Sequence, residues 1–148
     1  MLQSARSLAL GLVLTSFSLT GLAENTTHAG SYTIHHQALA TGSLTPQIAS
    51  AYGIQPSKSR GLLNVAVLKD EPGTAGTPVK AQVRAVARDR TGQVRDIPMR
   101  EVMDGEAIYY LGVLRIQDQE TLTFNLEVKP LGSQETFTAT LSQQFVTQ

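Results

Sequence analysis

The chain has 148 residues, no cysteine, and equal numbers of basic and acidic side chains, 12 of each. Without cysteine it forms no disulfide, carries no lipid on an N-terminal cysteine, and offers no thiolate for catalysis or metal binding. The balanced charge argues against nucleic-acid binding, which needs clustered positive charge to displace counterions.

Residues 1–23 have the pattern of a secretory signal peptide. Arg6 supplies the positive charge, residues 8–20 form an apolar core, and small residues precede the expected cleavage between Ala23 and Glu24. An uncleaved membrane anchor is the alternative, but this stretch is shorter than the roughly 20 apolar residues of a spanning helix and contains several Ser and Thr. The sequence therefore predicts a periplasmic protein, with secretion beyond the cell as the lesser alternative.

The mature chain, residues 24–148, has the length of one domain with one core. It keeps 11 basic side chains against 12 acidic ones, and no further stretch is long and apolar enough to span a bilayer. No stable membrane insertion is expected after cleavage.

The first half of the mature chain predicts two strands and one short helix. Alternating side chains indicate a strand over residues 30–38. A helix is expected over residues 46–52, because Thr45 is a good N-cap and Pro46 suits the first helical position. A dense apolar strand follows at 61–69, and then a loop rich in Pro, Gly and Thr at 70–78.

Residues 79–88 alternate most clearly between apolar and polar side chains, as a half-buried strand does. A type I turn is expected at residues 89–92, with Gly92 in the left-handed position. Apolar matching across this turn predicts two cross-strand pairs, Val83 with Met99 and Ala85 with Ile97.

A second hairpin is expected around Asp104 and Gly105, as the two central residues of its turn, followed by a strand at 107–116. That register predicts two further pairs, Met99 facing Tyr110 and Arg100 facing Tyr109. Two more alternating strands follow at 121–129 and 137–145. Seven strands with hairpin signals between most neighbours predict an all-β fold, an antiparallel sandwich resembling immunoglobulin or fibronectin type III domains.

Several dispersed segments resemble one bacterial family, the domain of unknown function numbered 4426 in its series. The resemblance covers nearly the whole mature chain and is carried in order by Ala51-Tyr52-Gly53-Ile54, Leu62-Leu63-Asn64-Val65, Arg100-Glu101-Val102, Gly105-Glu106-Ala107-Ile108-Tyr109-Tyr110, Glu120-Thr121-Leu122 and Gln143-Gln144-Phe145. It implies a small exported β domain. It implies no activity, and it offers no catalytic or binding residue to carry over.

The three histidines, His28, His35 and His36, form with Met99 and Met103 the nearest approach to a soft-metal ligand set. Adjacent strand residues point to opposite faces, so His35 and His36 do not readily share one ion. Met99 falls on the expected core face, where methionine is ordinarily a gap filler. We therefore predict no metal site and no cofactor.

Three carboxylates, Glu101, Asp104 and Glu106, cluster at the second hairpin turn, but a solvated turn does not separate pKa values as acid–base catalysis requires. No serine lies in a nucleophile elbow. We therefore predict no catalytic residue.

One face of the strand at 79–88 carries three cations, Lys80, Arg84 and Arg88. They could form a site for an anionic ligand, or they could lie on a face that is simply exposed to solvent. For the solvated face, Asp96 is expected to pair with Arg84 or Arg88.

The strand at 107–116 is apolar on both faces, so something must cover the second one. The helix at 46–52 or the N-terminal strand is the obvious cover. The alternative is a partner protein that docks there, with Arg100 and Tyr109 as anchors, because aromatic and Arg side chains dominate interface energies.

Taken together, the sequence favours a non-enzymatic exported module that binds a protein or another component of the cell envelope. A small periplasmic enzyme is the first alternative and a periplasmic metal-binding protein is the second. An unpaired sheet edge in the structure favours the binding module.

Overall fold

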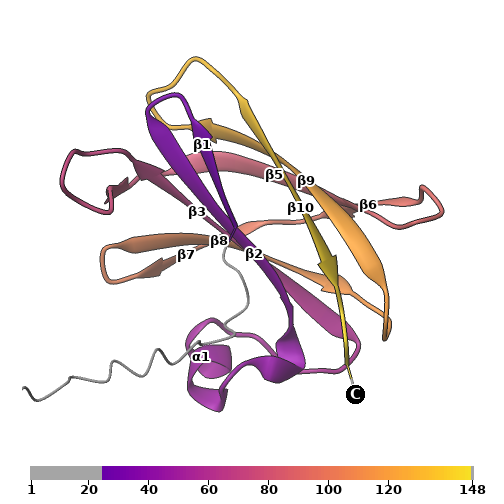
Figure 1. The fold of residues 1–148 in the computed structure, drawn as a ribbon. Helices are drawn as coiled ribbons and strands as arrows, with labels where there is room; N and C mark the ends of the chain where they lie inside the picture. The colour runs from indigo at the N-terminus through magenta and orange to yellow at the C-terminus, as the bar shows by residue number, and fades with distance from the viewer. Residues whose placement is uncertain (1–24, 148) are drawn as a thin grey trace, which may run out of the picture.

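The structure, a computed structural model, describes residues 25–147, so the predicted signal peptide and its cleavage site lie outside the described residues. The described chain is almost entirely β (Figure 1). Its elements in chain order are β1 (Asn25–Ala29), β2 (Tyr32–Ala40), a 3-10 turn (Thr41–Ser43), α1 (Pro46–Ala51), β3 (Arg60–Lys69), β4 (Thr77–Pro78), β5 (Ala81–Arg88), β6 (Val94–Ile97), β7 (Arg100–Asp104), β8 (Ala107–Arg115), β9 (Thr121–Pro130) and β10 (Phe137–Gln144). No helix within residues 25–147 is long and apolar enough to cross a membrane.

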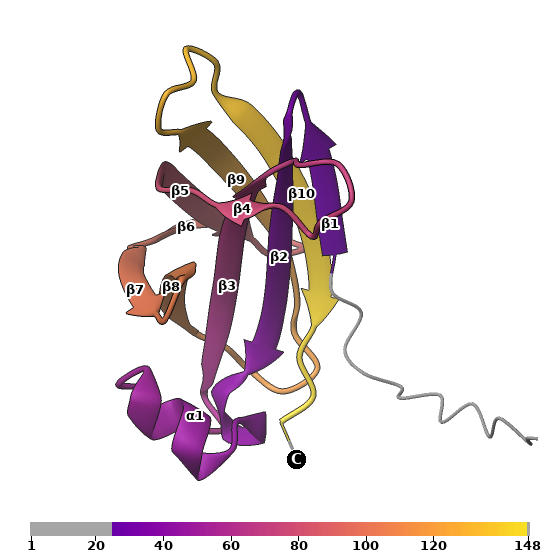
Figure 2. The same ribbon diagram turned by 90° about the vertical axis from the view of Figure 1, so that its left-hand side faces the viewer.

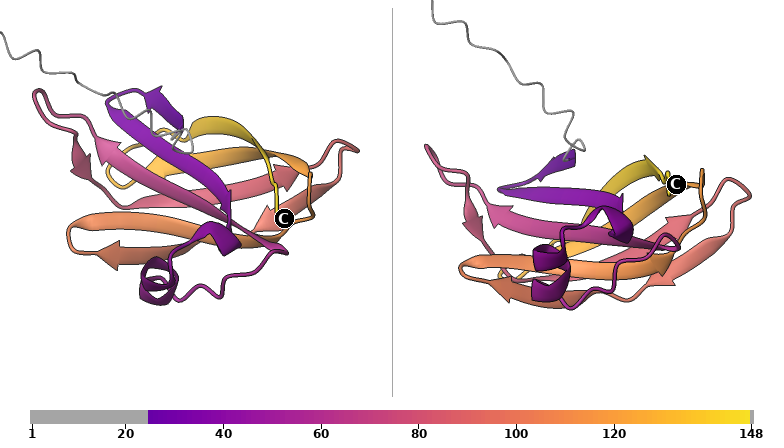
Figure 3. Two further views of the ribbon diagram at one scale, coloured as in Figure 1. Left: turned by 60° about the horizontal axis from the view of Figure 1, so that its bottom comes forward. Right: turned by 90° about the horizontal axis from the view of Figure 1, so that it is seen from below.

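The strands form two antiparallel sheets that stack as layers (Figure 3). One sheet has the order β1-β2-β3-β8-β7, with β4 also paired to β3, and the other has the order β10-β9-β5-β6. Without β1 and β4, this is the strand arrangement of immunoglobulin-type sandwiches, two sheets joined by Greek-key connections. The predicted fold class is confirmed.

The N-terminal segment differs from the prediction. β1 pairs with β2 through a tight turn at Gly30, whose φ of 57° lies in the left-handed region, so Gly30 does not start the strand. Residues 25–29, which precede the predicted first strand, thereby form an edge strand of their own. Thr77–Pro78, within the predicted loop, pairs with the end of β3 as β4.

The main core lies between the two sheets. Its fully buried side chains alternate along each strand, as the period-2 pattern predicts. The largest of them are Phe124, Phe145, Ile34, Leu63, Leu122, Leu126, Val65, Val67 and Val128.

The short helix α1 lies at one end of the molecule (Figure 2), and the residues that flank it, Leu44, Tyr52 and Ile54, pack on part of the outer face of the six-stranded sheet. Thr45 caps the helix, with its hydroxyl oxygen accepting from the Ile48 N–H at 3.3 Å. After the helix, Ile54 is buried against Leu62 and Leu111 of the sheet. The predicted helix is therefore present, and Tyr52 and Ile54, which follow it, shield part of the second apolar face of β8.

The predicted strand after the Asp89 turn is divided into two strands that belong to different sheets. The predicted pair of Ala85 with Ile97 is formed between β5 and β6. At Pro98 the chain leaves this sheet, and from Arg100 it continues as β7 in the other sheet.

The predicted register of the second hairpin is wrong by two residues. Tyr110 faces Glu101, not Met99, and Tyr109 faces Val102, not Arg100. The physical reason is the turn, in which Gly105 is the first of the two central residues, between the paired Asp104 and Ala107. A glycine with positive φ fits that position in a type II′ hairpin turn.

Candidate functional site

The residues predicted as partner anchors, Arg100 and Tyr109, hold α1 against the sheet. The Tyr109 ring packs on the Tyr52 ring with centroids 5.8 Å apart, and Arg100 Nη2 donates to the Tyr52 carbonyl oxygen. The Tyr52 hydroxyl donates to Asp104 Oδ2 at 3.0 Å. Burial, and then this bond, raise the pKa of Tyr52. Tyr109 is only half-buried and borders a shallow hollow of about 190 Å³, so its contact with a partner stays a prediction.

The three histidines do not converge. His36 points into the core, with Nε2 2.8 Å from Thr27 Oγ1 and with Nδ1 buried and unpartnered among the described residues. Burial lowers the pKa of His36. His35 lies on the opposite face, and the exposed His28 has its Nδ1 3.1 Å from Thr33 Oγ1. Within residues 25–147, no three His, Cys, Asp or Glu side chains are placed to hold a metal ion.

The three carboxylates of the second hairpin have separate surroundings. Glu101 accepts a hydrogen bond from the Tyr110 hydroxyl at 3.1 Å and lies 3.4 Å from Lys80 Nζ. Asp104 is bonded to the α1 end instead, and Glu106 is exposed in the turn. The carboxylates thus support local structure and do not form an acid–base pair.

The basic stripe is also divided. Lys80 pairs with Glu101, whereas Arg84 and Arg88 are exposed and form no ion pair with any residue in the described part of the chain. The expected partner, Asp96, lies opposite Val86 and pairs with neither arginine. Arg84 is therefore available to a ligand or partner.

The structure has an unpaired edge on β5 where the sequence predicts a continuous pairing. β6 pairs only with Ala85 and the following residues of β5, so residues 81–84 have β9 on one side and no strand of the described chain on the other. Leu131 N donates to the Lys80 carbonyl at 2.8 Å, which shows that even-numbered residues bond toward β9. Since antiparallel bonding alternates, the N–H and C=O of Val83 point to the open side.

One edge donor is already occupied. The backbone N–H of Ala81 donates to the Tyr110 hydroxyl at 2.8 Å, and this hydroxyl in turn donates to Glu101. Burial is the main cause that raises the pKa of Tyr110, so its hydroxyl keeps the proton it donates. The free part of the edge is therefore centred on Val83.

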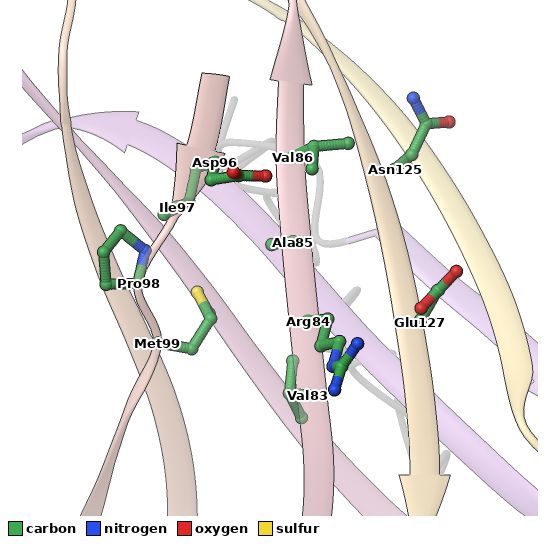
Figure 4. Close-up of a pocket in the computed structure, with 10 residues that line it drawn as sticks. All are labelled: Val83, Arg84, Ala85, Val86, Asp96, Ile97, Pro98, Met99, Asn125 and Glu127. Atoms are coloured by element: carbon green, nitrogen blue, oxygen red, sulfur yellow. The ribbon is translucent and has the colours of Figure 1, made fainter. Parts of the chain in front are cut away.

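A hollow of about 520 Å³ lies beside this edge (Figure 4). Its apolar lining comes from Val83, Ala85 and Val86 of β5, from Ile97 at the end of β6, and from Pro98 and Met99 of the crossover. Its polar rim consists of exposed outward-facing side chains, Arg84, Asp96, Asn125 and Glu127. We call the unpaired edge at residues 81–84, together with this hollow, the β5 groove.

Gly112 of β8 makes the crossover possible. A Cβ on Gly112 would overlap Ile97 Cγ2 and Met99 Sδ and would come within 3.2 Å of the Pro98 carbonyl oxygen. The crossover therefore packs directly on the backbone of β8, in a space that only glycine leaves free. Because the crossover packs on β8, Met99 does not pair with Val83 as predicted, and the groove beside Val83 stays open.

Pro98 was the sequence signal for this site. A proline inside a predicted strand marks an edge, a bulge or an end, since it cannot donate to a ladder. The predicted register ran through Pro98 to Met99, and so it closed the edge that the structure leaves open.

Comparison with known proteins agrees with the fold. The family model described as "Domain of unknown function (DUF4426)" matches residues 26–148. The crystal structure of a DUF4426 family protein from Pseudomonas aeruginosa PAO1 is 30% identical with a TM-score of 0.71, and the match covers 84% of this chain and 96% of that one. A search of curated proteins returns no match.

Two structures of FetP from uropathogenic Escherichia coli strain F11 share the fold at 11% identity. One is FetP expressed in the periplasm of E. coli, with a TM-score of 0.62 and coverage of 84% of this chain and 94% of that chain. The other is a copper-bound FetP variant, with a TM-score of 0.63 and coverage of 85% and 97%. The family match spans every strand that forms the β5 groove, and the chain belongs to the DUF4426 family of domains of unknown function.

Proposed function

We propose that this protein is a non-enzymatic binding module of the bacterial periplasm, and that its β5 groove binds an extended segment of another envelope polypeptide. The observation that carries the proposal is the backbone N–H and C=O of Val83, which no strand of residues 25–147 pairs and which lie beside an apolar hollow. In strand addition, main-chain hydrogen bonds supply affinity while pockets for alternate side chains supply specificity. The groove offers both within a few residues.

Export by a cleaved signal peptide is part of this proposal. It is supported by the pattern of residues 1–23, and FetP, which shares the fold, has been expressed in the periplasm. N-terminal sequencing of the protein recovered from the periplasmic fraction is expected to start at Glu24. An N-terminus at Met1 would contradict cleavage.

The enzyme alternative has less support. The charged side chains around the hollow, Arg84, Asp96 and Glu127, all lie on its exposed outer rim, whereas its interior wall is apolar. Catalysis by general acid and base needs such groups within hydrogen-bond reach of one buried reacting atom. Shape and apolar contact are what this hollow offers instead.

Metal binding is the second alternative, and the copper-bound FetP variant is its only external support. In this chain Met99 faces the β5 groove, Met103 is 54% exposed on β7, and the histidines lie on β1 and β2. These ligand types are thus spread over several elements. Titration of the mature protein with copper and zinc tests this alternative, and a dissociation constant below micromolar would favour it over the groove.

Site-specific photocrosslinking in cells tests the proposed function. A benzophenone amino acid is placed at Arg84, beside the groove, or at Arg88, which is on the same strand and face but in the half that β6 covers. We expect one polypeptide to crosslink at position 84, through a segment that mass spectrometry maps to a few consecutive residues. Position 88 is the matched control.

A second change in the same protein blocks the edge. Val83→Pro removes the edge N–H while leaving the bonds to β9, because those involve the even-numbered residues of β5. Val83→Lys is the companion variant, since lysine protects natural edges and its stem can lie along apolar surface. Both variants should abolish the crosslink at position 84. Equal crosslinking at positions 84 and 88, or persistence in both folded variants, would overturn the proposal.

A further inference from the structure

We infer that the β5 groove selects a segment in which an aliphatic or methionine side chain is followed directly by Asp or Glu. The inference rests on the proposed function and names the chemistry of the partner. It follows from the direction in which an added strand must run and from the charges around Gln82.

The added strand is expected to run antiparallel to β5. Both existing neighbours of β5, namely β6 and β9, pair with it in this way. The last residue of β6, Ile97, lies opposite Ala85, so β6 runs toward the unpaired edge. A segment that continues the line of β6 therefore places one residue opposite Val83 and its next residue opposite Gln82.

The residue opposite Val83 faces inward. Val83 itself packs against the main core, and side chains directly opposite each other on antiparallel strands share a face. This partner residue enters the space between Val83, Ile97 and Met99, three apolar side chains that belong to the main core or pack against it. An unbranched or γ-branched apolar side chain suits a hollow that is lined by a flexible methionine.

The residue opposite Gln82 faces outward, onto a cationic surface. Arg84 lies two residues after Gln82 on β5, and Lys80 lies two residues before it, directly ahead of the strand. Lys129 lies opposite Gln82 on β9. All three cations are exposed, and Gln82, Arg84, Lys129 and Glu127 border one shallow hollow of about 290 Å³.

The acidic side chains nearby compensate this charge only in part. Glu101 lies 3.4 Å from Lys80, and Glu127 lies opposite Arg84 without forming an ion pair with it in the described structure. A partner carboxylate over Gln82 is thus within reach of three cations, and of these only Lys80 is paired with a carboxylate of the described residues. Charge complementarity therefore favours Asp or Glu at this position.

A selection from random peptides tests the inference. A phage-displayed pool of random peptides is panned against the protein purified from the periplasm, and the same pool is panned against the edge-blocked Val83→Lys variant. Sequences enriched only on the unblocked protein should carry an apolar residue followed by Asp or Glu. Replacing that acidic residue by Gln in a synthetic peptide should weaken binding about three- to fivefold at low salt, as expected for exposed ion pairs.

Charge reversal makes the test specific. The Arg84→Glu variant should enrich peptides with Lys or Arg in place of the acidic residue, whereas the matched Arg88→Glu variant should keep the acidic preference, because Arg88 lies opposite Val94 of β6. The acidic preference should also shrink as salt is raised. An unchanged preference on Arg84→Glu would overturn the inference.

The failure of the inference and that of the proposed function give different results. Peptides that slow hydrogen exchange of the Val83 amide but show no acidic preference overturn only the inference. If no sequence is enriched over the Val83→Lys variant, or if bound peptides leave the Val83 amide unprotected, the proposed function itself is overturned.

Discussion

The Tyr110 hydroxyl lies 2.8 Å from the backbone nitrogen of Ala81, so a side chain of one sheet occupies the first edge donor of a strand in the other sheet. The same hydroxyl donates to Glu101, which lies 3.4 Å from Lys80. This chain of contacts closes one end of the β5 edge. The edge left for a partner begins beyond it, at Val83.

Tyr110→Phe should lower the free energy of unfolding by about 1 kcal/mol, the usual net contribution of one hydrogen bond. Ala81 would lose the acceptor of its N–H, so its amide should also exchange faster with solvent. Urea unfolding and hydrogen exchange measure the two effects. The matched control is Tyr109→Phe, because the Tyr109 hydroxyl has no hydrogen bond with the described residues. Equal losses in both variants would refute the role given to the Tyr110 hydroxyl.

Gly112→Ala should destabilise the fold by about 1–3 kcal/mol, the typical cost of overpacking a core. The added methyl group would overlap Ile97 and Met99, and the crossover at Pro98 would have to move outward. Thermal unfolding measures the loss, and binding of a selected peptide reports the shape of the groove. Gly42→Ala is the control, since its Cβ would meet nothing closer than 3.7 Å. A stable Gly112→Ala protein with unchanged peptide binding would contradict the proposed dependence of the crossover on glycine.

Acidification should destabilise the protein through His36. Burial lowers the pKa of His36 in the folded state below the ordinary histidine value of 6.5, so the unfolded state takes up the proton first. The contribution of neutral His36 to the free energy of unfolding is therefore complete above about pH 6.5, and it is lost as the pH falls from there through the folded-state pKa.

Unfolding measured across this pH range checks the sign. His36→Gln keeps a nitrogen that can reach Thr27, but this nitrogen cannot take up a proton. The variant should therefore reduce the slope of unfolding free energy against pH. The neighbouring variant His35→Gln should retain most of it. A slope that survives unchanged in His36→Gln would assign the acid sensitivity to other groups.

Tyr109→Ala should cost roughly 1–3 kcal/mol, less than the loss of a fully buried aromatic ring, because Tyr109 is half-buried. It removes the ring against which Tyr52 packs, and so it should loosen α1 from the sheet. Faster proteolysis within residues 41–59 and increased binding of a hydrophobic dye would report the uncovered apolar surface around Leu111. Thr140→Ala, an exposed change on β10, is the control for surface substitutions. Unchanged proteolysis would show that α1 is held by other contacts.

The fold class could be predicted from the sequence because its signals are local. Alternation along residues 79–88 and 121–129 placed the core faces, and Thr45 and Pro46 placed the one helix. Apolar matching also gave the correct pair of Ala85 with Ile97. In each case, the structure depends only on residues that are neighbours in the sequence or that face each other across one turn.

The second hairpin shows where local reasoning fails. A type I′ turn would have Asp104 and Gly105 at its centre, whereas a type II′ turn has Gly105 at its first central position. Both turns place apolar residues of the two strands opposite each other. The choice between them depends on contacts outside the hairpin. In the register formed, Glu101 bonds the Tyr110 hydroxyl and Arg100 reaches the Tyr52 carbonyl of α1.

Local sequence patterns are sufficient to predict the alternation of the strands, the short helix and the absence of thiol chemistry. The site depends on tertiary packing, because the β5 groove is formed by a crossover between sheets. Pro98 indicates that a strand ends, but the residues around it do not indicate which sheet the chain joins next. That choice depends on the space above Gly112, and Gly112 adjoins Pro98 only once both sheets have formed.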